Sequence, residues 1–133
     1  VLLRADHVYA YQLAVVVDDA EQGITDVVRG ADLLDSTPRQ IYLQNLLQFT
    51  TPDYCHVPVA VNANGEKLSK QTRATPIDYS NPVPALFSVL QFLGQQPPAR
   101  LAAADVTEFW NWTIAHWQPD RIRRTRFAPA PAP

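Results

Sequence analysis

Hydrophobic residues run almost without interruption from Val8 to Val17, and the run ends at the acidic pair Asp18 and Asp19. A continuous apolar run of this length is typical of a strand that is covered on both faces. We therefore predict a strand over residues 8–17. Because neighbouring side chains of an extended segment point to opposite sides, we interpret the two acids as a structural turn rather than a catalytic or metal-binding pair.

A strand, helix, strand pattern follows. Residues 24–30 read as a short strand that places Arg29 near its carboxyl end, after which Gly30 lets the chain turn. Ser36 supplies a capping hydroxyl and Pro38 lies near the first helical position, which predicts a helix through about residue 49. Its apolar stripe comprises Ile41, Leu43, Leu46, Leu47 and Phe49. With a third strand near residues 54–61, the pattern implies parallel pairing and an α/β fold.

Ligands of such sheets collect beyond the carboxyl ends of the strands, so Arg29 and the loop that begins at Asn62 are candidates to border one crevice. The turn at Asn64 and Gly65 predicts a hairpin, with residues 67–70 on its far arm or just past it.

Beyond residue 75 the pattern changes to helices separated by prolines. Residues 84–93 predict a helix that ends at Gly94, and Asp105 and Glu108 have the spacing of a capping box. The helix that this box starts carries an apolar stripe that we interpret as core, made of Val106, Phe109, Trp110, Thr113, Ile114 and Trp117. We expect three parts: residues 1–75, a small helical region over 76–127, and a disordered alanine and proline tail over 128–133.

Composition narrows the class of protein. The 133 residues are 47% hydrophobic, enough for a good core, and the absence of methionine suggests a piece of a longer protein. The net charge of −2 excludes a uniformly basic nucleic-acid binder. Four arginines near the C-terminus could still bind a phosphate backbone. The alternative is that they lie at a solvated helix end, near its last carbonyls. They are Arg121, Arg123, Arg124 and Arg126.

Cys55 is the single cysteine, so the chain has no internal disulfide. Because His7, His56 and His116 are scattered along the sequence, we also expect no metal site in this chain. No stretch approaches the roughly 20 apolar residues of a membrane helix. We therefore predict a cytoplasmic protein with no membrane partner.

Both lysines of the chain, Lys67 and Lys70, fall in one four-residue stretch after the Asn-Gly turn. Compact ammonium groups on flexible stems suit phosphate. Chance clustering on a surface hairpin is the alternative, so the spacing by itself leaves phosphate binding open.

Several blocks in order carry a resemblance: residues 11–19 (YQLAVVVDD), 23–32 (GITDVVRGAD), 36–40 (STPRQ), 56–58 (HVP) and 67–70 (KLSK). Together they resemble the second half of the Rossmann-like catalytic domain of glutamyl-tRNA synthetases, and KLSK is similar to the class I KMSKS loop. The likeness is closer to the glutamyl-queuosine branch, which lacks an anticodon-binding domain.

The resemblance implies an ATP-dependent ligase that activates glutamate and transfers it to queuosine at the wobble position of tRNA(Asp). It assigns Lys70 and Lys67 to catalysis, these lysines with Leu68 and Ser69 to ATP binding, and Tyr11 and Arg29 to glutamate binding. Magnesium would accompany ATP. The HIGH signature and a possible zinc site would belong to the N-terminal half of the same protein.

The sequence departs from the family at Val15, where many full-length enzymes carry asparagine, and at Ala31, which replaces an acidic residue. Two alternatives stay open: a fragment of an ordinary glutamyl-tRNA synthetase that charges the tRNA 3′ end, and a non-catalytic paralogue that binds tRNA through the four C-terminal arginines.

Overall fold

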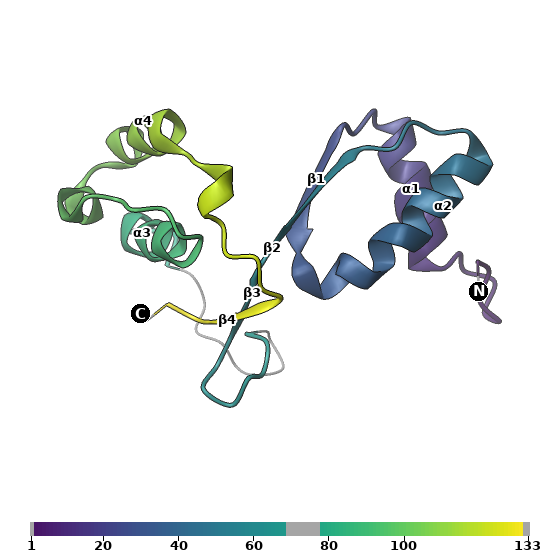
Figure 1. Cartoon of the computed structure of the whole chain (residues 1–133), viewed down its shortest axis with the longest axis horizontal. Helices are drawn as coiled ribbons and strands as arrows, with labels where there is room; N and C mark the ends of the chain where they lie inside the picture. Colours follow the sequence, from purple (N-terminus) through teal and green to yellow (C-terminus); the bar gives the residue numbers. More distant parts are fainter. Residues whose placement is uncertain (1, 69–77, 132–133) are drawn as a thin grey trace. The chain divides into compact units, whose positions relative to one another are not determined.

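The computed structural model describes residues 2–68 and 78–131 (Figure 1). Contacts divide the chain into two compact units, Val1–His56 and Val57–Pro133. This division falls earlier in the chain than the boundary at residue 75 that we expected from the sequence. Each unit is described by itself.

The first unit holds the predicted strand, helix, strand pattern. Strand β1 (Asp26–Gly30) leads through a 3-10 turn, η1 (Ala31–Ser36), into helix α2 (Thr37–Leu47), and β2 (Asp53–Val57) pairs with β1. Asp53 N donates to Thr25 O over 2.9 Å where the strands begin, and Arg29 contacts His56 near their ends. The two strands therefore run in the same direction, which confirms the predicted parallel pairing.

The predicted strand over residues 8–17 is wrong. The structure has a helix, α1 (Tyr11–Glu21), which buries Val16 and packs against α2. Asp18 and Asp19 lie inside this helix, so their interpretation as a turn is also wrong. An apolar run does not distinguish a buried strand from a buried helix. The helix also lacks a start signal, because Ala10 precedes it and offers no capping side chain.

Helix α2 is confirmed, but its buried face is not the predicted apolar stripe. The buried residues are Thr37, Gln40 and Gln44, whereas Leu46 is 61% exposed. Each glutamine side chain donates one hydrogen bond: Gln40 Nε2 donates to Gln12 Oε1, and Gln44 Nε2 donates to the hydroxyl of Tyr54. Among the described residues, Gln44 Oε1 is buried without a hydrogen-bond partner.

Ser36 precedes α2 without capping it. Its side chain makes no hydrogen bond to the first turn of the helix, and its hydroxyl accepts from Gln12 Nε2 over 2.9 Å. The serine therefore ties α1 to the start of α2 instead of serving as the predicted cap.

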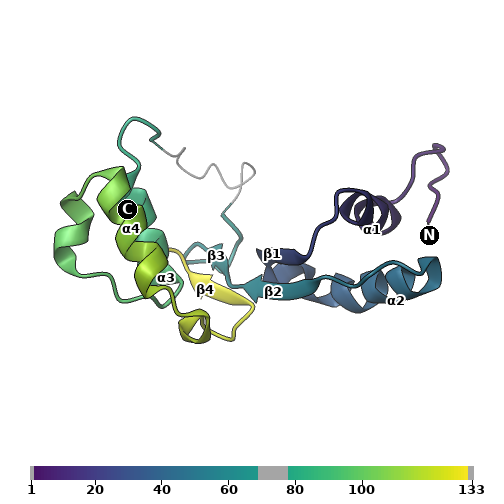
Figure 2. The same ribbon diagram turned by 90° about the horizontal axis from the view of Figure 1, so that it is seen from above.

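The second unit contains a two-stranded parallel sheet of β3 (Val59–Val61) and β4 (Phe127–Pro129), which lie side by side in Figure 2. Pro58, which has no N–H to donate, separates β3 from β2, so the predicted strand over residues 54–61 is two strands. Ala128 is only 3% exposed and Ala130 N donates to Val61 O. The prediction of a disordered tail from residue 128 is therefore wrong for residues 128–130.

The hairpin after β3 is confirmed. Gly65 N donates to Asn62 O, and Lys67 forms an antiparallel bridge with Val61 on the far arm. Gly65 has a φ of +79°, a conformation that favours glycine.

The described part of the second unit also contains four helical elements: α3 (Val83–Phe92), η2 (Ala99–Ala103), α4 (Val106–His116) and η3 (Pro119–Arg121). Their core consists of Val83, Leu90, Leu101 and Phe109. The predicted capping residue is confirmed, because Asp105 Oδ1 accepts from Glu108 N over 2.8 Å. Within residues 2–68 and 78–131, no helix combines the length and apolar character needed to span a membrane.

The stripe along α4 is core only in part. Phe109 and Thr113 are buried, but Ile114 is 75% exposed, and Val106, Trp110 and Trp117 are exposed as well. Trp110, Ile114 and Trp117 line an apolar hollow of about 470 Å³ with side chains of α3. The interpretation of the whole stripe as core is therefore wrong.

Candidate functional site

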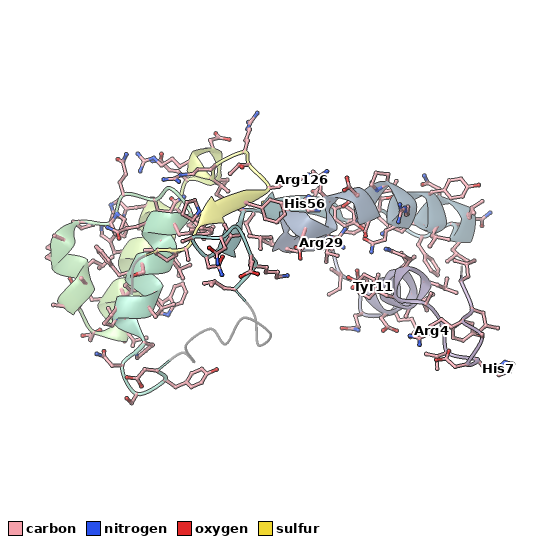
Figure 3. The ribbon with its side chains drawn as sticks, turned by 90° about the horizontal axis from the view of Figure 1, so that it is seen from below. Arg4, His7, Tyr11, Arg29, His56 and Arg126 are labelled. Carbon is pink, nitrogen blue, oxygen red and sulfur yellow. The ribbon has the colours of Figure 1, made fainter. Side chains whose placement is uncertain are left out.

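Arg29 is the centre of a polar cluster in the first unit. Its Nη2 donates to Thr37 Oγ1 over 2.8 Å and points to Leu33 O at 3.5 Å. Its Nε lies 3.4 Å from His56 Nε2, and the guanidinium carbon lies 5.1 Å from the centre of the Tyr54 ring. Figure 3 shows the Arg29 and His56 side chains close together. The guanidinium is thus fixed in orientation by several neighbours.

The fold explains why these residues meet. Arg29 and His56 are the penultimate residues of β1 and β2, and the two strands are parallel neighbours. Alternate residues of a strand share a face, so Tyr54 lies on the same side as His56, and their rings stack 6.2 Å apart at 9°. Thr37 reaches the cluster as the first residue of α2.

The hydrogen bonds require a neutral His56. The guanidinium can only donate, so the Thr37 oxygen accepts from Arg29 and its proton is available to His56 Nε2, 3.0 Å away. Because Arg29 Nε also donates to His56 Nε2, we assign Nε2 as an acceptor and the ring proton to Nδ1. Burial, with the nearby positive charge of Arg29, lowers the pKa of His56 below its ordinary value of 6.5.

Tyr11, which the resemblance assigns to glutamate binding, is the first residue of α1 and is 52% exposed. The next residue, Gln12, bonds to both Ser36 and Gln40. These bonds fix the start of α1 beside the start of α2. Tyr11 is thus near the junction that carries Thr37, while its contact with glutamate stays a prediction.

The lysine loop lies in the second unit and is described only in part. Lys67 is exposed on the far arm of the hairpin, and Leu68, 39% exposed, donates its N–H to Ala60 O. Ser69 and Lys70 lie outside the described residues. The shared crevice that we predicted for Arg29 and this loop remains a prediction.

Of the four C-terminal arginines, only Arg121 lies at the end of a helical element. Helix α4 ends at His116, Arg121 belongs to η3, and the other three follow it. The alternative of arginines near the last carbonyls of a helix fits Arg121, which is in the last turn of η3, and is wrong for Arg123, Arg124 and Arg126. Arg121, Arg123, Arg124 and Arg126 are all exposed.

Cys55 lies between Tyr54 and His56 on β2 and is a free thiol. In the part of the chain that the structure describes, no three His, Cys, Asp or Glu side chains gather closely enough to hold a metal ion.

The sequence pattern did not identify Thr37, His56 and Tyr54 as partners of Arg29. One signal could have found His56: two predicted parallel strands with a polar residue near the carboxyl end of each bring those residues together. Thr37 carried no such signal, because its position depends on the path of η1.

Solved structures with a similar fold include a glutamate tRNA ligase from Elizabethkingia meningosepticum in complex with its amino acid, with a TM-score of 0.65 and 20% identity. This match covers 97% of the present chain and 29% of that protein. The glutamate-tRNA synthetase of Elizabethkingia anophelis matches with a TM-score of 0.63, also at 20% identity, over 93% of this chain and 29% of that one. These likenesses concern the fold.

Curated relatives are more similar in sequence. The glutamyl-Q tRNA(Asp) synthetase of Aromatoleum aromaticum is 56% identical over 98% of this chain, and that of Pseudomonas aeruginosa is 54% identical over 97%. The chain spans 42% and 44% of the lengths of these two relatives. The model of the catalytic domain of class I tRNA synthetases (E and Q) matches residues 1–110. The chain therefore belongs to the catalytic-domain family of the class I tRNA synthetases for glutamate and glutamine.

Proposed function

We propose that the full-length protein joins glutamate to ATP, giving glutamyl-adenylate and releasing pyrophosphate. It then transfers the glutamyl group to queuosine at the wobble position of tRNA(Asp), and AMP leaves. The support for this substrate is the 56% and 54% identity to relatives that carry the name glutamyl-Q tRNA(Asp) synthetase. The present chain contributes part of the machinery, and the remainder of the same protein contributes the rest.

The observation that carries the proposal is the fixed guanidinium of Arg29. A guanidinium whose orientation is set by Thr37 and His56 can direct an N–H group at a carboxylate. In this role Arg29 binds the side-chain carboxylate of glutamate, and Tyr11 contributes a hydroxyl to the amino acid. Glutamine is rejected because its neutral amide leaves the arginine charge unpaired.

In this proposal the loop at residues 67–70 binds the phosphates of ATP. Attack of the glutamate carboxylate on the α-phosphate concentrates negative charge on phosphate oxygens, and lysines on a loop can follow that charge. Lys70 has the principal role, Lys67 helps to position the loop, and Leu68 and Ser69 complete the ATP-binding segment. Magnesium that arrives with ATP would share in neutralising the phosphate charge.

The exposed arginines after η3 are suited to the tRNA backbone. Phosphate contacts position a nucleic acid without reading its sequence. Arg121, Arg123, Arg124 and Arg126 would therefore contribute affinity for tRNA, and the choice of queuosine would depend on other contacts.

Exchange of radioactive pyrophosphate into ATP tests the activation step in the full-length protein. We expect glutamate-dependent exchange. Arg29→Gln should raise the KM for glutamate by about 10², because a hydrogen-bonded charge pair with the substrate is lost. The KM for ATP should change by less than about twofold, because Arg29 is assigned to the amino acid and not to the nucleotide.

Arg39→Gln is the matched control, because Arg39 is an exposed arginine of α2 outside the Arg29 cluster. A glutamate KM that is the same in Arg29→Gln and Arg39→Gln would show that Arg29 does not bind glutamate. No exchange in the unmodified protein, with or without tRNA, would favour the non-catalytic paralogue.

A further inference from the structure

We propose that Thr37 and His56 are positioning residues that hold the Arg29 guanidinium in the orientation needed to receive the glutamate carboxylate. The inference deepens the proposed function and rests on it. Neither residue is assigned contact with glutamate itself. Each acts through Arg29, which both contact directly.

Three residues form a closed set of contacts. Arg29 Nη2 lies 2.8 Å from Thr37 Oγ1, Thr37 Oγ1 lies 3.0 Å from His56 Nε2, and Arg29 Nε lies 3.4 Å from the same nitrogen. Two contacts to different nitrogens of one planar group fix its rotation, whereas a single contact would leave it free to swing. The contact between Thr37 and His56 also holds these two supporting residues to each other.

The burial of Thr37 makes its hydroxyl a fixed support. Its residue is 8% exposed at the first position of α2, and the hydroxyl both accepts from Arg29 and lies within hydrogen-bond reach of His56. A valine at this position would keep the shape of the side chain and remove both interactions. A serine would keep the hydroxyl.

The ring of His56 is held as well. It stacks on Tyr54, whose hydroxyl accepts from the buried Gln44 amide, while the Tyr54 ring also lies beneath the Arg29 guanidinium. The cluster is therefore anchored to α2 at two points, Thr37 and Gln44. Residues of helix α2 and of the sheet formed by β1 and β2 therefore together determine the direction of the Arg29 guanidinium.

The geometry also indicates which edge of Arg29 meets the substrate. The contacts that the structure gives within the described residues use Nε and Nη2. We assign the remaining nitrogen, Nη1, to the carboxylate of glutamate. A guanidinium that rotates away would keep its charge but lose this directed contact.

The test compares Thr37→Val with Thr37→Ser in the full-length protein by glutamate-dependent pyrophosphate exchange. Thr37→Val should raise the KM for glutamate about tenfold and leave the KM for ATP within about twofold, because the lost contacts act on a charged group that meets only the amino acid. Thr37→Ser should bring the glutamate KM back to within about threefold of the unmodified protein, because the hydroxyl is retained.

His56 is tested by the same comparison. His56→Leu should raise the glutamate KM, and His56→Gln should restore part of it, because the glutamine oxygen can accept where Nε2 did. If the glutamate KM is unchanged in both Thr37→Val and His56→Leu, the inference is overturned and the proposed function stays intact. The same holds if the KM for glutamate and the KM for ATP rise equally in these variants. No exchange in the unmodified protein would overturn the proposed function and this inference with it.

Discussion

The Arg29 contacts that the structure gives within residues 2–68 and 78–131 are with groups that carry no charge when His56 is neutral. The Thr37 hydroxyl, the Leu33 carbonyl, the Tyr54 ring and the His56 imidazole all stabilise the guanidinium without neutralising it. An arginine stays protonated in proteins, and the proposal assigns this charge to the glutamate carboxylate. A protonated His56 would lose its acceptor nitrogen and place a second positive charge beside the first.

The pKa of His56 provides a direct measurement of this arrangement. Burial, followed by the charge of Arg29, lowers that pKa. In Arg29→Gln the charge is removed, so the pKa of His56 should rise, but it should stay below 6.5 because burial still disfavours the charged ring. At a given pH near 6 the protonated fraction of His56 should therefore be larger in the variant than in the unmodified protein.

An NMR titration of the His56 ring in the full-length protein would follow this pKa, with Arg39→Gln as the control of equal charge change. A pKa that stays constant or falls in Arg29→Gln would contradict the described proximity of the two side chains.

At the residue scale, the sequence located Arg29 but not its support. A residue near the carboxyl end of a predicted strand can be recognised from a local pattern, and β1 does end one residue after Arg29. The partners Thr37 and His56 are 8 and 27 residues away in the chain. Their convergence depends on the strand pairing and on the path of η1, which no local pattern encodes.

At the element scale, turns and caps were more informative than hydrophobic stripes. Gly65, Gly94 and the Asp105 cap were predicted correctly because each depends on a local backbone requirement. The strand at residues 8–17 was wrong because its apolar run fits helix and strand equally well. The buried face of α2 was missed because Gln40 and Gln44 are polar, and the hydrogen bonds of their Nε2 atoms to Gln12 and Tyr54 form only in the folded chain.

Gly94, in the helical region, should not tolerate a side chain. Its φ is +76°, and a Cβ atom there would lie 2.2 Å from the backbone oxygen of Arg121. Gly94→Ala therefore combines a strained backbone with a clash against main-chain atoms that cannot rotate away. We expect the free energy of unfolding to fall by about 2 kcal/mol or more, measured by thermal or urea unfolding of the full-length protein.

Gly23→Ala is the control for this prediction. Gly23 has a similar φ of +67°, but nothing lies within 4 Å of the added Cβ. It should therefore show the backbone strain alone, about 1 kcal/mol. An equal loss in the two variants would mean that the contact between Gly94 and Arg121 does not constrain the fold.

At the scale of the whole molecule, the proposed chemistry is distributed over more than one compact unit. The Arg29 cluster belongs to the first unit and Lys67 to the second, and the chain spans less than half the length of the relatives compared above. In the proposal, glutamate binding depends on Arg29 and phosphate chemistry on the loop that contains Lys67. The proposal that the two roles act together is therefore tested in the full-length protein.

The measurement that tests the central claim most directly is the position of labelled glutamate on tRNA(Asp). The full-length protein is incubated with ATP, labelled glutamate and tRNA(Asp) that carries queuosine, and the tRNA is then digested with nuclease. The same tRNA with unmodified guanosine at the wobble position is the control. We predict label on the queuosine nucleotide and none on the control tRNA, whereas label on the 3′-terminal adenosine would contradict the account.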